Sequence, residues 1–134
     1  MRTKIALLRK IGAERPYGIT KPLEVVDAEL SEPESGEMLV KIAAAGLCHS
    51  DLSVINGDRP RDMPLALGHE ASAVVQAVGP NVTRFAIGDH IVLIFAPSCG
   101  HCLPCAEGRP ALCEPAAVAA GKGSLIGGTK HLTY

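Results

Sequence analysis

The chain has 134 residues and a net charge of −1, so it lacks the basic excess of proteins that bind nucleic acid or anionic membranes. Hydrophobic residues make up 47% and charged residues 20%, the balance of one globular domain with a core of its own. No apolar stretch reaches the roughly 20 residues that span a bilayer, and the apolar run after Met1 is too short for a secretory signal. We therefore expect a cytoplasmic protein with neither nucleic acid nor membrane as a partner.

Short apolar runs separated by glycine and proline turns fill the chain up to Ala96. They predict β-strands at Lys4–Arg9, Leu23–Leu30, Met38–Ala45, Ala71–Gly79 and His90–Phe95. One segment, His49–Ile55, is typical of a helix, with Asp51 in its first turn and Gly57 just after its end. Many short strands with regular turns favour a barrel or sandwich over a parallel sheet.

Other segments carry weaker signals. The acidic residues between Asp27 and Glu37 indicate a solvated turn. After Ala96 the strand pattern ends, and a loop rich in Cys, Pro and Gly would take its order from a metal. The glycines at 121, 123 and 127 miss the dinucleotide-binding spacing by one residue and do not follow a strand, so we expect no nucleotide-binding fold within the chain. The end at Tyr134 has the pattern of a cut inside a domain.

The most informative motif is the C-x2-C-x2-C-x7-C run formed by Cys99, Cys102, Cys105 and Cys113. Four thiolates bind Zn²⁺ tetrahedrally and leave no open position, which is the arrangement of a structural site. Disulfides fit poorly in a reducing compartment and would leave Cys48 unpaired. A [4Fe–4S] cluster matches the first spacings, but its last spacing is three residues rather than seven. Zinc is therefore the favoured metal for this site.

A second constellation lies upstream, where Cys48-His49-Ser50-Asp51 is followed by Gly68-His69-Glu70. A thiolate, an imidazole and nearby carboxylates suit a metal site with room for a substrate. Taken singly, Cys48 could be a small buried apolar residue, His69 a turn histidine and Ser50 a helix cap.

These motifs, in this order and together with the segment from Gly36 to Lys41, resemble the start of the catalytic domain of zinc-dependent medium-chain alcohol dehydrogenases. The resemblance covers the chain from Lys4 to about Thr129. It implies a mainly β, GroES-like β-barrel with short helices, occupying residues 1–134 and carrying a structural-zinc loop at 97–114. The Rossmann cofactor domain would lie outside the chain.

The same resemblance implies an oxidoreductase that interconverts alcohols and aldehydes or ketones with NAD(H), as a homodimer or homotetramer. One structural zinc would lie in the four-cysteine loop and one catalytic zinc elsewhere. Cys48 and His69 would be two of the three protein ligands of the catalytic zinc, the third coming from further downstream. Glu70 would be an alternate ligand or a carboxylate beside the metal, and Asp51 would accept the free ring N–H of His69.

Four more positions are compared with the family. Ser50 would bind the substrate hydroxyl and begin a proton relay, and His49 would contact the cofactor pyrophosphate. Ser53 stands where many members carry a relay histidine, and Ala73 stands where a glycine is usual. The long cysteine loop followed by Gly127-Gly128-Thr129 resembles that of the branch of the family that acts on primary, aromatic and glutathione-adduct alcohols.

Two other function classes stay open at this point. The chain could be a stand-alone zinc-binding β-barrel without catalysis, or an Fe–S redox module. The sequence assigns no role to His90, His101 or His131.

Overall fold

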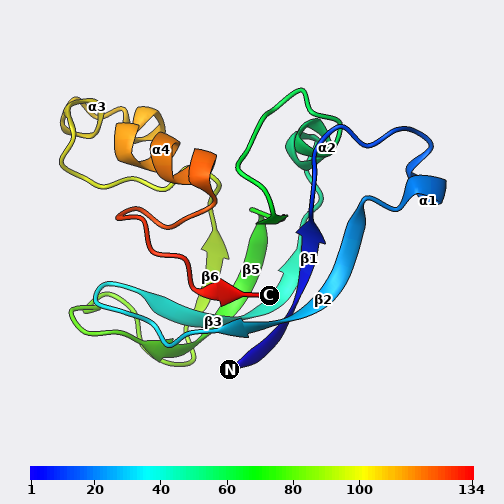
Figure 1. Cartoon of the computed structure of the whole chain (residues 1–134). Helices are drawn as coiled ribbons and strands as arrows, with labels where there is room; N and C mark the ends of the chain where they lie inside the picture. The colour runs from blue at the N-terminus through cyan, green and yellow to red at the C-terminus, as the bar shows by residue number, and fades with distance from the viewer.

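A computed structural model describes all 134 residues as two curled antiparallel sheets with short helices at their margins (Figure 1). No helix is long and apolar enough to cross a membrane. In chain order the elements are β1 (Arg2–Leu8), α1 (Tyr17–Thr20), β2 (Leu23–Leu30), β3 (Met38–Ala45), α2 (His49–Ile55), β4 (Leu65–Ala66), β5 (Ala71–Val78), β6 (His90–Leu93), α3 (Leu103–Ala106), the 3₁₀ helix η1 (Pro110–Leu112), α4 (Glu114–Lys122) and β7 (Leu132–Thr133).

The first sheet has the strand order β4-β1-β2-β7, and the pairing of β1 with β2 forms its centre. The register of this antiparallel pair runs from Arg2 opposite Glu29 to Leu8 opposite Leu23. Cross-strand ion pairs join β1 to β2 at Arg2–Glu29 and Lys4–Asp27, and Arg9, just after β1, pairs with Glu24. The prediction of a solvated acidic turn is therefore wrong for Asp27 and Glu29, which lie within β2 and pair with cations of β1.

The second sheet has the order β3-β5-β6. Ala71, the first residue of β5, pairs with Ala45 on one side and with Leu93 on the other. Because both pairings are antiparallel, the carboxyl ends of β3 and β6 meet the amino end of β5 at one edge of the sheet. Three chain segments therefore leave the sheet side by side.

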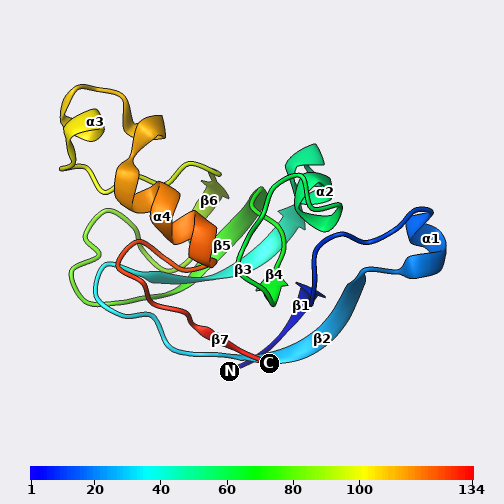
Figure 2. The same cartoon turned by 45° about the horizontal axis from the view of Figure 1, so that its top comes forward.

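The two sheets curl around a shared interior (Figure 2). A cavity of about 560 Å³ lies between them and is lined by Ile5 of β1, Leu39 of β3 and Leu125 of the C-terminal segment. This mainly β architecture confirms the predicted fold class. Hydrogen bonds do not join the two sheets into one continuous sheet, so the barrel is half-open.

Most strand predictions are confirmed, and α2 has the predicted bounds. The strand expected at His90–Phe95 ends early, at Leu93. Ile94 and Phe95 follow it with 73% of their surface exposed, because they have left the sheet.

Helix α4 was not predicted, although its sequence has clear helix signals. The segment is rich in alanine, the best helix former. Glu114 lies in its first turn and Lys122 in its last, so both charges oppose the helix dipole favourably. Gly123 ends the helix in the left-handed region, at φ 61°. The Pro and Gly residues at its margins obscured this pattern.

His131, which has no role assigned from the sequence, lies just before β7. Its Nε2 is 2.7 Å from Glu37 Oε2, and its Nδ1 is 2.5 Å from the Ser31 hydroxyl. The backbone N–H of Glu34, together with the His131 ring, lowers the pKa of the Glu37 carboxyl. These contacts connect the C-terminal strand to the segment between β2 and β3, so Glu37 is not part of a purely solvated turn.

A small apolar cluster holds α2 in place. Val54 and Ile55 of α2 are buried against Leu8 at the end of β1. The Ile55 carbonyl also accepts hydrogen bonds from the N–H groups of Gly12 at 2.9 Å and Ala13 at 3.1 Å. The helix therefore has a fixed position relative to the sheets, which matters because its amino end carries the candidate site residues.

The Leu8→Ala substitution tests this packing. Leu8 is fully buried, and truncating such a leucine removes contacts and leaves a cavity, so we expect a loss of about 2–5 kcal/mol of unfolding free energy. Urea denaturation measures the effect. Leu47→Ala is the matched control, because Leu47 is 100% exposed and its truncation should change stability by less than about 0.5 kcal/mol. Equal effects of the two substitutions would contradict the packing.

Candidate metal centres

The pairing of β3 with β5 brings Cys48 and His69 together. Cys48 follows the carboxyl end of β3, and His69 precedes the amino end of β5, which is the same edge of the sheet. Gly68 has φ +118°, a conformation that L side chains rarely adopt, so a glycine is needed where the chain turns toward His69. Two segments separated by 20 residues of chain thus supply one cluster.

Cys48, His69 and Glu70 form a candidate metal site. One ligand atom from each lies within 4.8 Å of the others, and His69 Nε2 is 3.8 Å from Glu70 Oε1. The Nδ1–H of His69 donates to Asp51 Oδ1 at 3.1 Å, which fixes the tautomer and leaves Nε2 facing Cys48 and Glu70. A thiolate, an imidazole and a carboxylate are suitable ligands for zinc with a position left open.

Ser50 lies inside this cluster. Its hydroxyl donates to Cys48 Sγ at 3.3 Å and lies 3.2 Å from His69 Nε2. The N-cap residue of α2 is Cys48, and the helix has no side-chain cap, so the interpretation of Ser50 as a helix cap is wrong. Its hydroxyl faces the candidate ligand atoms instead.

The contacts in the cluster shift two pKa values. The Ser50 hydroxyl and backbone N–H, together with His69, lower the pKa of the Cys48 thiol. Burial disfavours the charged form of His69, but Cys48 and Asp51 outweigh this effect and raise the pKa of the imidazole. The environment therefore favours the Cys48 thiolate, which is the form that binds metals.

The four cysteines of the loop between β6 and α4 form a second cluster. Their sulfurs all lie within 4.8 Å of one another, with Cys102 Sγ 3.4 Å from Cys105 Sγ and 3.9 Å from Cys113 Sγ. All five cysteines of the chain are free. Tetrahedral zinc with Zn–S bonds of about 2.3 Å holds its sulfurs ~3.8 Å apart, so the cluster fits a single zinc ion.

Backbone N–H groups approach these sulfurs. The Cys99 N–H donates to Cys113 Sγ at 3.3 Å, and the Cys102 N–H donates to Cys99 Sγ at 3.4 Å. Hydrogen bonding by the backbone of His101 lowers the pKa of Cys99 to about 6, whereas burial and the Cys102 thiol raise the pKa of Cys105 to about 11. One thiolate forms readily, and a full set of four needs a cation to balance their charge.

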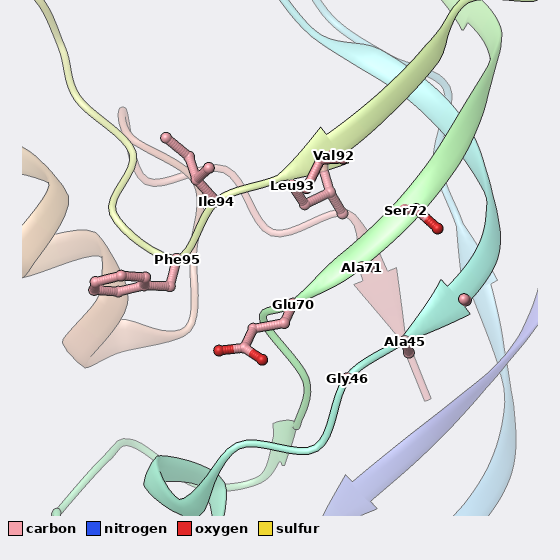
Figure 3. A pocket seen from close by; sticks show the side chains of 10 residues that line it. Ala45, Gly46, Glu70, Ala71, Ser72, Val92, Leu93, Ile94 and Phe95 are labelled. Carbon is pink, nitrogen blue, oxygen red and sulfur yellow. The ribbon is translucent and has the colours of Figure 1, made fainter.

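An apolar pocket of about 530 Å³ adjoins the first cluster (Figure 3). It is lined by the ends of β3, β5 and β6 and by Ile94 and Phe95 beyond β6. Glu70 belongs both to this pocket and to the candidate metal site, and Figure 3 shows its carboxylate reaching into the open space. The cluster is therefore continuous with a space that could receive an apolar ligand.

The sequence-predicted residues are thus found in three places. Cys48, Ser50, Asp51, His69 and Glu70 lie together. The four loop cysteines form the second cluster. His49 is exposed at the start of α2, outside both. Gly46 and Phe95, which line the pocket, were not singled out from the sequence. The one available signal was their place in the chain, since Gly46 stands two residues before Cys48 and Phe95 two residues after Leu93.

The chain is similar to several alcohol dehydrogenases. It is 46% identical over 114 residues to the NDMA-dependent alcohol dehydrogenase of Amycolatopsis methanolica, covering 85% of this chain and 29% of that protein. It is 38% identical over 119 residues to the S-(hydroxymethyl)glutathione dehydrogenase of Synechocystis, covering 88% of this chain and 32% of that protein. The chain therefore spans about a third of the length of these relatives.

The fold has matching solved structures. The crystal structure of benzyl alcohol dehydrogenase from Acinetobacter calcoaceticus superposes with a TM-score of 0.85 at 34% identity, over 98% of this chain and 34% of that one. The family model of the alcohol dehydrogenase GroES-like domain matches residues 34–133, which include both candidate metal centres. With most of its length matched in this way, the chain belongs to the alcohol dehydrogenase GroES-like domain family.

Proposed function

We propose that the chain is the metal-holding part of the catalytic domain of a zinc-dependent alcohol dehydrogenase, which interconverts alcohols and aldehydes or ketones with NAD(H). The observation that carries this proposal is the convergence of Cys48, His69 and Glu70, with Ser50 among them and an apolar pocket beside them. A non-catalytic zinc-binding module would need only a closed site. The relatives are enzymes about three times as long, which supports a cofactor domain that would lie outside residues 1–134.

Bound zinc would act as a Lewis acid that lowers the pKa of an alcohol hydroxyl, and the nicotinamide would accept the hydride. Cys48 and His69 would hold the metal from two sides, and Asp51 would keep His69 in the tautomer that leaves Nε2 free. Ser50, at 3.2 Å from that nitrogen, would receive the substrate hydroxyl proton and pass it on. His49 would extend toward the cofactor from its exposed position.

The four-cysteine cluster would hold a structural zinc ion. Its sulfur separations of 3.4 and 3.9 Å support a single ion. A [4Fe–4S] cluster places four irons and four sulfides among its cysteine ligands and would hold them farther apart. The Fe–S alternative is disfavoured for this reason.

Three further assignments concern the substrate, the compartment and the oligomeric state. The apolar wall of the pocket, with Leu93, Ile94 and Phe95, suits the hydrocarbon part of a primary or aromatic alcohol, and benzyl alcohol, an aromatic alcohol, is named for one of the similar solved structures. We assign the protein to the cytoplasm, where its cysteines stay reduced, and we assign the whole enzyme a homodimeric or homotetrameric state. An activity panel of alcohols with NAD and NADP on the full-length protein tests the substrate and cofactor.

The structural site predicts the metal content of the chain. The purified 134-residue chain should hold about one tightly bound zinc ion, and replacing Cys99, Cys102, Cys105 and Cys113 together by serine should remove it. Elemental analysis by mass spectrometry measures this. Cys48→Ser is the control, since it leaves the loop intact and should retain the tight zinc. Zinc content unchanged in the quadruple variant would refute the site.

The proton path predicts the effect of removing the Ser50 hydroxyl. In the full-length enzyme, Ser50→Ala should lower kcat by roughly 10²-fold or more, the usual scale for a positioned proton-transfer group. Ser50→Thr keeps a hydroxyl and should be mild. Steady-state kinetics measure both.

Ser53 supplies the control for that experiment. Its hydroxyl donates to the His49 carbonyl at 3.3 Å, along the helix and away from the cluster. Ser53→Ala should therefore change kcat little. Turnover of Ser50→Ala near that of the wild type would mean that water carries the proton and would remove Ser50 from the mechanism.

The isolated chain should not oxidise alcohols with NAD. No segment has the glycine spacing of a dinucleotide-binding fold, and the open site has two strong ligands completed by Glu70 or water. The NADH absorbance formed by the purified chain with benzyl alcohol measures this. NAD-dependent turnover by this chain would overturn the division into a metal-holding part and a separate cofactor domain.

A further inference from the structure

Gly46 faces Glu70 where the pairing of β3 with β5 ends. Ala45 opposite Ala71 is the last pair of the strand register. One residue further, the Gly46 N–H donates to the Glu70 carbonyl at 2.8 Å. The two residues thus continue the antiparallel pairing as direct neighbours, at the edge of the pocket that both of them line (Figure 3).

The backbone at Gly46 comes closer to Glu70 than a residue with a side chain allows. A Cβ on Gly46 would lie 3.3 Å from the Glu70 Cβ and 2.9 Å from its Oε2. Directly opposed residues in antiparallel sheets normally keep their Cβ atoms about 4.5–5.5 Å apart. The carboxylate of Glu70 therefore occupies the space that a side chain at position 46 would take.

That position of the carboxylate is what brings Glu70 to the candidate metal site. With Oε2 against Gly46, Oε1 lies 3.8 Å from His69 Nε2 and within the Cys48 cluster. The side chain is 47% exposed, and no hydrogen bond from another side chain fixes the carboxylate. The free space beside Gly46 is thus what admits the carboxylate to this position.

We propose that Gly46 is a positioning residue for Glu70: the missing side chain at position 46 lets the Glu70 carboxylate act as the oxygen ligand for a divalent cation held by Cys48 and His69. The size of residue 46 then sets the cation affinity of this site. The inference rests on the proposed function, since the cation is the one assigned there to the open site.

Gly46→Ala is a clean test of this idea. Gly46 is not among the residues with positive φ, so alanine can adopt its backbone conformation. Alanine also keeps the N–H that donates to the Glu70 carbonyl. The shortest contact, at 2.9 Å, involves the flexible end of Glu70 and is relieved when the carboxylate rotates away from the cluster, whereas the 3.3 Å contact with the Glu70 Cβ needs a backbone shift of a few tenths of an ångström. We expect the variant to fold with this small shift.

The experiment is a Co²⁺ titration of the 134-residue chain after its four-cysteine site has been filled with Zn²⁺. Visible absorption reports Co²⁺ bound by Cys48. Gly46→Ala and Glu70→Gln should each weaken Co²⁺ binding by about 10- to 100-fold. The double variant should bind no more weakly than the weaker single variant, because both changes remove one contact. Gly18→Ala is the matched control, since a Cβ there meets nothing within 4 Å and φ is not positive, and it should bind as the wild type does.

A metal-free measurement accompanies the titration. The carboxyl ¹³C resonance of Glu70 should shift in Gly46→Ala and stay in place in Gly18→Ala. Wild-type Co²⁺ affinity in Gly46→Ala, an unshifted Glu70 resonance, or single effects that multiply in the double variant would each overturn the inference and leave the proposed site standing. Absence of any second Co²⁺ in the wild type would overturn the inference, because Glu70 would then not complete the site of Cys48 and His69. It would leave the proposed function standing, since the third protein ligand of the catalytic zinc is expected from outside residues 1–134.

Discussion

The antiparallel pairing of β3 with β5 is the constraint on which the candidate site depends. It ends at Ala45 and Ala71, and the chain on each side then turns directly into ligand-bearing segments. The same residue, Ala71, pairs with Leu93, so the segment that leads to the four-cysteine loop leaves from the same edge. A shift of one residue in this register would move every side chain to the opposite face and would separate Cys48 from His69. The register of the sheet therefore sets the relative positions of the site residues.

Much of this was accessible from the sequence. The alternating apolar runs predicted β2 and β3 with their observed bounds, and the residues from His49 to Ile55 predicted α2. The cysteine spacing predicted a cluster because ligands with only two residues between them can converge only in a tight loop, as Cys99 and Cys102 do. The convergence of Cys48 with His69 is a different case. It depends on a strand pairing between distant segments, and it was predicted through the family resemblance of the motifs.

What the sequence could not predict depends on tertiary contacts. Nothing in the neighbouring sequence shows why residue 46 is a glycine, because the need for glycine arises from the approach of Glu70, at the start of another strand. His131 contacts Glu37 only because β7 pairs with β2, and a pair of residues is too short to be recognised as a strand. Ile94 and Phe95 continue the apolar pattern of β6 beyond the sheet because they form the wall of a pocket. Apolar residues that line a pocket cannot be distinguished in sequence from apolar residues of a buried strand.

The two centres obtain their order from different sources. Helix α2, which carries Ser50 and Asp51, is fixed by Val54 and Ile55 against Leu8, so the open site is preformed by packing. The four-cysteine loop contains only α3 and η1, of four and three residues, and neither has a buried residue. Helices shorter than about 12 residues are marginal on their own. Helix α2 is stabilised by packing against the apolar core, whereas the loop would be ordered by a metal bound to its four sulfur atoms. We therefore expect substitutions in the apolar cluster and substitutions of the loop cysteines to act on separate parts of the molecule, and we expect loss of a metal from the loop to leave the geometry around His69 in place.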